Sequence, residues 1–186
     1  MTADTAAITL ADLVLLEHDI YLRMRTAADL HGVRRQRRHT ITELDAAMNR
    51  LEERGAYPDD PLAALLLVGI TDVVTRDLAT VAPDVDLAMR FWFDLATRAP
   101  DGYAAAPWCI RAILAWQVGD RRTALADAWA ALEDNDEYTM AQYVVTACRF
   151  DVPMPDEWTD GSIDHRRRRL SGEVAPGMTD RHTVEQ

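Results

Sequence analysis

Hydrophobic residues recur at intervals of three or four positions along most of the chain, which is the spacing of amphipathic helices. Thr9 and Thr40 each open a Thr-x-x-acid pattern that can cap a helix start. The apolar stripes that follow run to a glycine, Gly32 in the first case and Gly55 in the second. No segment alternates apolar and polar residues between hairpin turns, so no sheet is expected. The pattern predicts an all-α protein of about seven helices stacked in antiparallel hairpins.

The segment 62–70 is almost entirely apolar and predicts a helix that is buried on most sides and continues to Val81. Asp60 is expected to cap this helix, with Pro61 at its first position, where the missing N–H does no harm. Within it, Asp72 and Arg76 have the spacing of an ion pair along one helix. If the helix is buried, these charges would instead pair across the core, where they would fix helix register or line a small pocket. We favour a structural role for them.

Three consecutive aromatic residues, Phe91, Trp92 and Phe93, lie in the helix predicted after Asp84. Successive side chains of a helix point about 100° apart, so the three rings cannot share one narrow groove. Either neighbouring helices enclose this helix, which we favour, or one ring remains exposed and meets a partner. Trp92 and Phe93 are therefore candidate partner-binding residues.

Three short helices separated by two tight breaks are predicted between residues 107 and 148. Residues around the breaks follow the spacing of part of a tetratricopeptide repeat: Gly119-Asp120, Ala124, Ala131-Leu132 and Asn135-Asp136. Together with the segments LLVGITDVVTRD (66–77) and RAPDGYAAAPW (98–108), this pattern resembles the C-terminal helical half of an actinobacterial family, domain of unknown function 4192. The resemblance covers 60–155. It implies stacked helical hairpins, with a tetratricopeptide-like pair near the C-terminal end, and no activity.

The chain is therefore expected to form a single helical domain over 1–155. This domain would comprise an N-terminal hairpin (1–56) and the family-like helical core (60–155). The segment 156–186 has too few apolar residues to fold alone and is expected to be a flexible, disordered basic tail.

The net charge of −11 disfavours a general attraction to polyanions. All twenty basic residues are arginine, and many of them lie in two clusters, at 34–38 and 166–169. The arginine and alanine content is typical of a GC-rich genome, which agrees with an actinobacterium or one of its phages. The sequence shows no secretory signal and no apolar run long enough to span a membrane, so we expect a cytoplasmic protein with no membrane partner.

Candidate catalytic and metal-binding groups are sparse. The five histidines are scattered, and the only local cluster, Glu17-His18-Asp19, is assigned to solvent because adjacent helical residues diverge. Cys109 and Cys148 lie in apolar helical sequence, which predicts buried, inert thiols. We therefore expect no enzymatic activity, no metal and no cofactor.

The arginine cluster at 34–38 is the sharpest sign of a partner. We expect it on a turn, where Arg34, Arg35, Arg37 and Arg38 would bind phosphate or the acidic face of another protein. Because no aromatic residues are interleaved and the chain is acidic, protein is the favoured partner. The sequence therefore predicts a non-enzymatic helical interaction or scaffold module, whose partner can be a second copy of the chain as a homo-oligomer. The alternative is an accessory protein that binds nucleic acid through the arginine turn.

Overall fold

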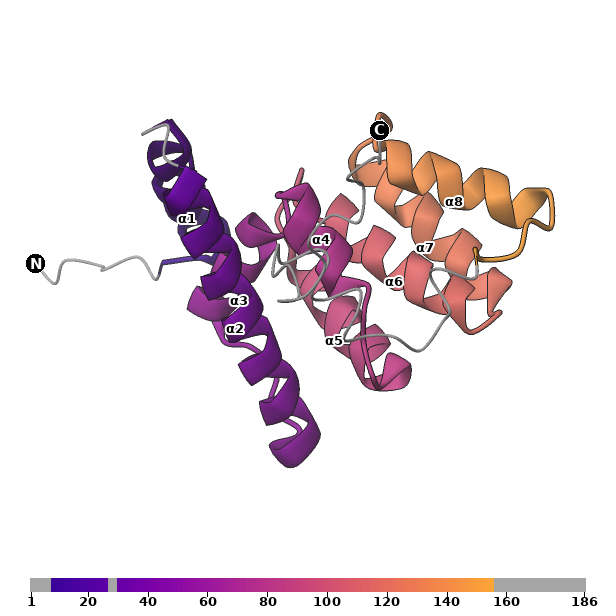
Figure 1. Cartoon of the computed structure of the whole chain (residues 1–186), viewed down its shortest axis with the longest axis horizontal. Coiled ribbons are helices and arrows are strands. Elements are labelled where there is room, and N and C mark those ends of the chain that lie inside the picture. Colours follow the sequence, from indigo (N-terminus) through magenta and orange to yellow (C-terminus); the bar gives the residue numbers. More distant parts are fainter. Residues whose placement is uncertain (1–7, 27–29, 156–186) are drawn as a thin grey trace, which may run out of the picture.

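The structure is a computed structural model that describes residues 8–26 and 30–155. Within these ranges it contains eight helices and no strand, which confirms the all-α prediction. The helices are α1 (Leu10–Thr26), α2 (Leu30–Arg54), α3 (Asp60–Gly69), α4 (Val73–Ala79), α5 (Val85–Arg98), α6 (Ala105–Gln117), α7 (Arg121–Asp134) and α8 (Thr139–Arg149). Figure 1 shows α1 and α2 at one end of the molecule and α7 and α8 at the other. The tail predicted for 156–186, with its arginines at 166–169, lies outside the described residues.

The start of α1 is capped as its sequence predicts. The amide N–H of Thr9 donates to the carboxylate of Asp12 (3.0 Å), and the amide N–H of Asp12 donates to the hydroxyl of Thr9 (3.2 Å). This reciprocal pair satisfies two amide groups that would otherwise lack partners in the first turn.

The second helix differs from the prediction, because α2 begins at Leu30 and runs without interruption to Arg54. Gly32 therefore does not end a helix, and Thr40 is not a cap but a fully buried residue in the middle of α2. The expected turn at 34–38 is wrong, since these residues form helical turns of α2. Helix packing overrides the local signals here: the conformational cost of one helical glycine is only about 1 kcal/mol.

The long helix expected through Val81 is two helices, which raises the predicted seven to eight. The chain breaks after Gly69, and Asp72 caps the start of α4 by accepting a hydrogen bond from the amide of Thr75 (3.1 Å). At the start of α3 the cap is Asp59, one residue before the predicted Asp60, and it accepts from the amide of Leu62 (3.2 Å). Elsewhere Gly55 and Gly119 end helices in the left-handed conformation (φ 65° and 79°), as their sequence context predicts.

The hydrophobic core consists of two clusters that share α6. Ile110 and Leu114 of α6 pack with the buried residues of α1, α2, α3 and α5. Ile113 and Trp116 of the same helix pack with the buried faces of α7 and α8. Many of the residues on those faces are alanine, which lets the helices approach closely. Because α6 contributes to both clusters, it fixes the position of the α7–α8 end relative to the rest of the chain.

Helices α2 and α3 approach each other closely at one point. A Cβ atom on Gly69 would overlap the methyl group of Thr40 and would lie 2.7 Å from its hydroxyl oxygen. Glycine is therefore required at residue 69 by contact with α2, although it lies within an apolar helical run.

The thiol of Cys109 is buried (0% exposed), and burial raises its pKa to about 12. The thiolate is the reactive form, so we expect Cys109 in the native protein to be inert to an aromatic disulfide reagent. The thiol of Cys148 is only partly buried and should react first. Absorbance at equal reagent excess, with and without denaturant, measures both thiols. Fast native labelling of a Cys148→Ser variant would contradict the expectation for Cys109.

Candidate functional site

The functional arginines predicted from the sequence divide into two groups. Arg37 forms a two-point ion pair with Asp72, through Nε to Oδ1 (2.7 Å) and Nη2 to Oδ2 (2.8 Å). Burial works to raise the pKa of Asp72, but hydrogen bonds from Arg37 and Thr75 outweigh burial and lower it. Arg37 therefore ties α2 to the start of α4, and its guanidinium is engaged in the fold.

Arg34, Arg35 and Arg38 are exposed on α2. Their spacing of three and four residues places Arg38 beside the other two on one side of the helix. These three arginines form the basic face of α2, which an anionic group on a partner would complement.

The ion pair predicted between Asp72 and Arg76 is wrong, because Asp72 pairs with Arg37. Arg76 instead bonds to Asp77 (Nη2 to Oδ1, 3.0 Å) and to the hydroxyl of Tyr138 (Nη1 to Oη, 3.3 Å). Of the alternatives, pairing across helices describes Asp72, which bonds to Arg37 of α2, and lining a pocket describes Arg76.

The two aromatic candidates on α5 behave differently. Trp92 is 1% exposed and belongs to the core, so its prediction as a partner-binding residue is wrong. Phe93 is 48% exposed, although its ring contacts Trp108 edge-on and lies under the guanidinium of Arg111. The expected full enclosure of this helix is therefore wrong, and Phe93 is the ring that remains accessible.

His18 is not a solvent residue, contrary to expectation. Its Nδ1 lies 2.6 Å from the hydroxyl of Tyr103, and the two rings meet edge-on. This contact joins α1 to the loop before α6. The contact is explained by the packing of α1 against this loop. It adds neither an imidazole nor a carboxylate that could act together with His18.

Large aliphatic side chains are exposed on and just before α1. Leu22 is one of them (46%), and four more are Ile8 (72%), Leu15 (65%), Leu16 (56%) and Ile20 (41%). The opposite side of the helix is buried through Val14 and Tyr21. We call these four residues the α1 face. Sequence reasoning missed it, although Leu15 and Leu16 lie outside the main apolar stripe and are a visible signal that α1 is apolar on two sides.

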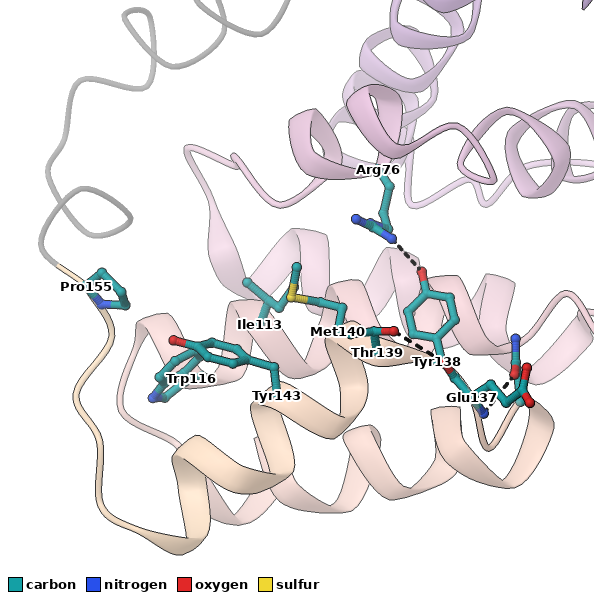
Figure 2. Close-up of a pocket in the computed structure, with 10 residues that line it drawn as sticks. Arg76, Ile113, Trp116, Glu137, Tyr138, Thr139, Met140, Tyr143 and Pro155 are labelled. Carbon is teal, nitrogen blue, oxygen red and sulfur yellow. Dashed lines mark hydrogen bonds between the residues drawn. The ribbon is translucent and has the colours of Figure 1, made fainter.

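A pocket of about 700 Å³ opens between α4, α6 and α8 (Figure 2). We call it the α4–α8 pocket, and its walls include Arg76, Ile113, Trp116, Tyr138, Met140 and Tyr143. Figure 2 shows Arg76 reaching from α4 toward Tyr138, with Trp116 and Tyr143 together at a distance from that pair. Apart from the pocket-lining role considered for Arg76, no local pattern indicates this pocket, because its walls come from α4, α6 and the segment 135–155.

Metal-ligand clusters and membrane-spanning helices are both absent from residues 8–26 and 30–155. No group of three or more histidine, cysteine or acidic side chains there could hold a metal ion. None of the described helices combines the length and the apolar character needed to cross a membrane.

The chain matches a known family. The model of the family described as Domain of unknown function (DUF4192) matches residues 7–154, from before α1 to beyond α8. The match is not limited to 60–155, where the resemblance was expected. No curated protein and no solved structure matches the chain. Because the family match covers most of its length, the chain belongs to the DUF4192 family.

Proposed function

We propose that this protein is a non-enzymatic helical module that works by binding protein, and that its first partner is a second copy of itself. The observation that carries this proposal is the α1 face, where four large aliphatic side chains remain in contact with water. Grouped apolar side chains of this kind are typical of a protein interface. Burying them would be favourable by roughly 25 cal/mol for each Å² removed from water.

Charge favours a second copy as the partner. Two exposed carboxylates, Asp12 and Asp19, lie between Leu15 and Leu16 around α1, so the α1 face is acidic as well as apolar, although Asp19 also pairs with Arg23 on the same helix. The neighbouring helix α2 carries the basic face. In a two-fold symmetric dimer every contact occurs twice, so the acids of each α1 can meet the arginines of the other α2. One pairing of the two chains thus buries the α1 face and joins opposite charges.

We expect the apparent mass of the full chain to rise with concentration toward that of a dimer, measured by light scattering and sedimentation equilibrium. The double variant Leu15→Glu/Leu16→Glu should weaken association at least about tenfold, because charges on the α1 face would have to be desolvated. Added salt should also weaken the dimer by screening the arginine–carboxylate contacts.

The matched control is Val73→Glu, which places the same charge on another exposed aliphatic residue (56% exposed), far from α1 in sequence. Circular dichroism should show equal helix content in all three proteins. A wild-type chain that stays monomeric at high micromolar concentration, or a double variant that associates like the wild type, would contradict the proposal.

Nucleic-acid binding is the second candidate, and the basic face of α2 favours it. Arg34, Arg35 and Arg38 would contact phosphates, while Arg37 remains bound to Asp72. If this function is correct, the affinity for mixed-sequence DNA or RNA falls steeply with salt, with a log–log slope set by the phosphates neutralised. The triple variant Arg34→Ala/Arg35→Ala/Arg38→Ala should abolish binding in fluorescence anisotropy. An absent or salt-insensitive signal excludes this candidate.

The cytoplasmic location, the actinobacterial or phage origin and the tetratricopeptide-like character of α6 and α7 stay predictions.

A further inference from the structure

The α4–α8 pocket is a second site, with residues different from those of the α1 face. Its volume of about 700 Å³ is in the range of pockets that hold small organic ligands. It has a polar end, formed by Arg76 and Tyr138, and an aromatic end, formed by Trp116 and Tyr143 (Figure 2). The chemistry of the two ends determines which ligand fits.

The polar end offers hydrogen-bond donors. The guanidinium of Arg76 has five N–H groups, and the hydrogen bonds found within the described residues use three of them, two to Asp77 and one to Tyr138. The hydroxyl of Tyr138 accepts from Arg76, so its own proton is available to a further acceptor. Burial raises the pKa of Tyr138, which keeps that proton in place at neutral pH. A ligand atom that binds here must therefore accept hydrogen bonds.

The aromatic end offers apolar surface. The indole N–H of Trp116 donates to the carbonyl of Val152 (3.2 Å), so the one donor of this side chain is already used. The ring of Tyr143 meets the indole edge-on at 5.9 Å between centroids. Figure 2 shows Ile113 and Met140 between this end and Tyr138, which makes the connecting wall apolar as well.

The charge of the polar end limits the acceptor to one negative charge. Arg76 is the single cation among the lining residues, and Asp77 already balances it in part at 3.0 Å. Glu137 adds a further carboxylate to the lining. These two carboxylates would repel a group with two negative charges, such as a phosphate monoester, more strongly than a group with one. A single carboxylate can receive the remaining guanidinium N–H groups and the phenol O–H.

We propose that the α4–α8 pocket binds an organic monocarboxylate, with the carboxylate at the polar end and an aromatic or branched apolar body at the aromatic end. Two sources supply this chemistry: a free arylalkanoic acid, and the C-terminal residue of a peptide that ends in an apolar side chain. Both place one carboxylate a few bonds away from an apolar group.

The experiment is a titration of the isotope-labelled full chain with phenylbutyrate and with its neutral analogue phenylbutyramide. Signals of the Trp116 indole N–H and the Met140 methyl group should shift with the acid. The amide should bind about tenfold more weakly, because it lacks the charge that strengthens hydrogen bonds to Arg76 and Tyr138. Equal affinities for the two probes, or no shift at Trp116 with millimolar acid, would overturn the proposal.

Variants separate the two ends of the pocket. Tyr138→Phe should weaken binding of the acid about tenfold and binding of the amide less, and so reduce the preference for the acid, because the lost phenol O–H bonds more strongly to a charged acceptor. Tyr143→Ala should weaken the binding of both probes by a similar factor, because it removes the apolar ring that both of them contact. The matched control is Tyr57→Phe, at an exposed tyrosine (46%) outside this pocket, and it should change neither affinity.

The titrations of the variants test the assignment of the polar end and the source of the carboxylate. A Tyr138→Phe variant that keeps the full preference for the acid would overturn the assignment of the polar end. If Tyr138→Phe does not fold, the comparison of acid and amide on the wild type and on Tyr143→Ala still decides it. Acetylglycylphenylalanine distinguishes the sources: tighter binding than phenylbutyrate indicates a peptide end, and weaker binding indicates a free acid.

Discussion

Replacing Gly69 with alanine is expected to destabilise the protein by about 2 to 3 kcal/mol, which is a large effect for one methyl group. The added Cβ would overlap the methyl of Thr40 and lie 2.7 Å from its hydroxyl oxygen and 3.0 Å from its Cβ. Thr40 is fully buried in α2, so neither helix can give way without disturbing the core around it. Urea unfolding followed by circular dichroism measures the change.

The double variant Thr40→Ala/Gly69→Ala is the control for this clash. Truncating Thr40 removes the two atoms that the new Cβ meets most closely and leaves the 3.0 Å contact. The Thr40 hydroxyl has no hydrogen-bond partner within the described residues, so no hydrogen bond is lost there. The double variant should therefore be more stable than Gly69→Ala alone. If Gly69→Ala were as stable as the wild type, the close approach of α2 and α3 would be wrong.

Replacing Arg111 with methionine is expected to cost about 3 to 5 kcal/mol at neutral pH, because it leaves a buried carboxylate without its cation. Asp127 of α7 is 5% exposed, and its Oδ1 accepts from Nη1 of Arg111 on α6 (2.8 Å). Its Oδ2 has no hydrogen-bond partner in the part of the chain that the structure describes. Methionine keeps much of the aliphatic stem of Arg111 but removes the guanidinium, whose Cζ lies 4.8 Å from the ring centroid of Phe93 and 5.7 Å from that of Trp108.

The destabilisation caused by Arg111→Met should depend on pH. Burial raises the pKa of Asp127 to about 6, although the attraction of Arg111 opposes the shift. A raised folded-state pKa means that the folded protein holds the proton more strongly than the unfolded chain does. The stability that Asp127 contributes is therefore present near pH 4 and below, and is lost as the pH rises through about 6. Without Arg111 the pKa rises further, so the variant should lose more stability relative to the wild type at about pH 8 than at about pH 5.

The double variant Arg111→Met/Asp127→Asn tests the cause. Asparagine is neutral and nearly isosteric, so the double variant should recover most of the stability lost at neutral pH and should lose the pH dependence. A penalty for Arg111→Met that is equal at both pH values would show that lost packing, and not the uncompensated carboxylate, causes the destabilisation.

Several features of the fold could be predicted from neighbouring residues alone. The reciprocal cap at Thr9 and Asp12 and the helix ends at Gly55 and Gly119 depend on local geometry. The same local rules failed at Gly32 and Thr40, where α2 continues. There the helix is stabilised by packing: Thr40 is buried against α3, and Arg37 reaches the start of α4.

The candidate sites also combine features that the sequence predicts with features that only tertiary contacts decide. The sequence identified the arginines at 34–38, but tertiary contacts engaged Arg37 with Asp72 and left its three neighbours exposed. It identified three adjacent aromatic residues on α5, but only packing decided that Trp92 is buried and Phe93 is accessible. A pocket-lining role was considered for Arg76, but the pocket itself could not be predicted, because Trp116 and Tyr138 come close to Arg76 only when separate helices pack.

By itself, the sequence determined that this chain is built from helices, where several of them begin and end, and that both cysteines lie in apolar helical sequence. These properties follow from the spacing of apolar residues and from capping groups within one turn, which act over a few residues. Only the tertiary structure decided which charges pair, which ring is exposed and where a pocket opens. Such properties depend on contacts between residues far apart in the chain, and no local pattern records those contacts.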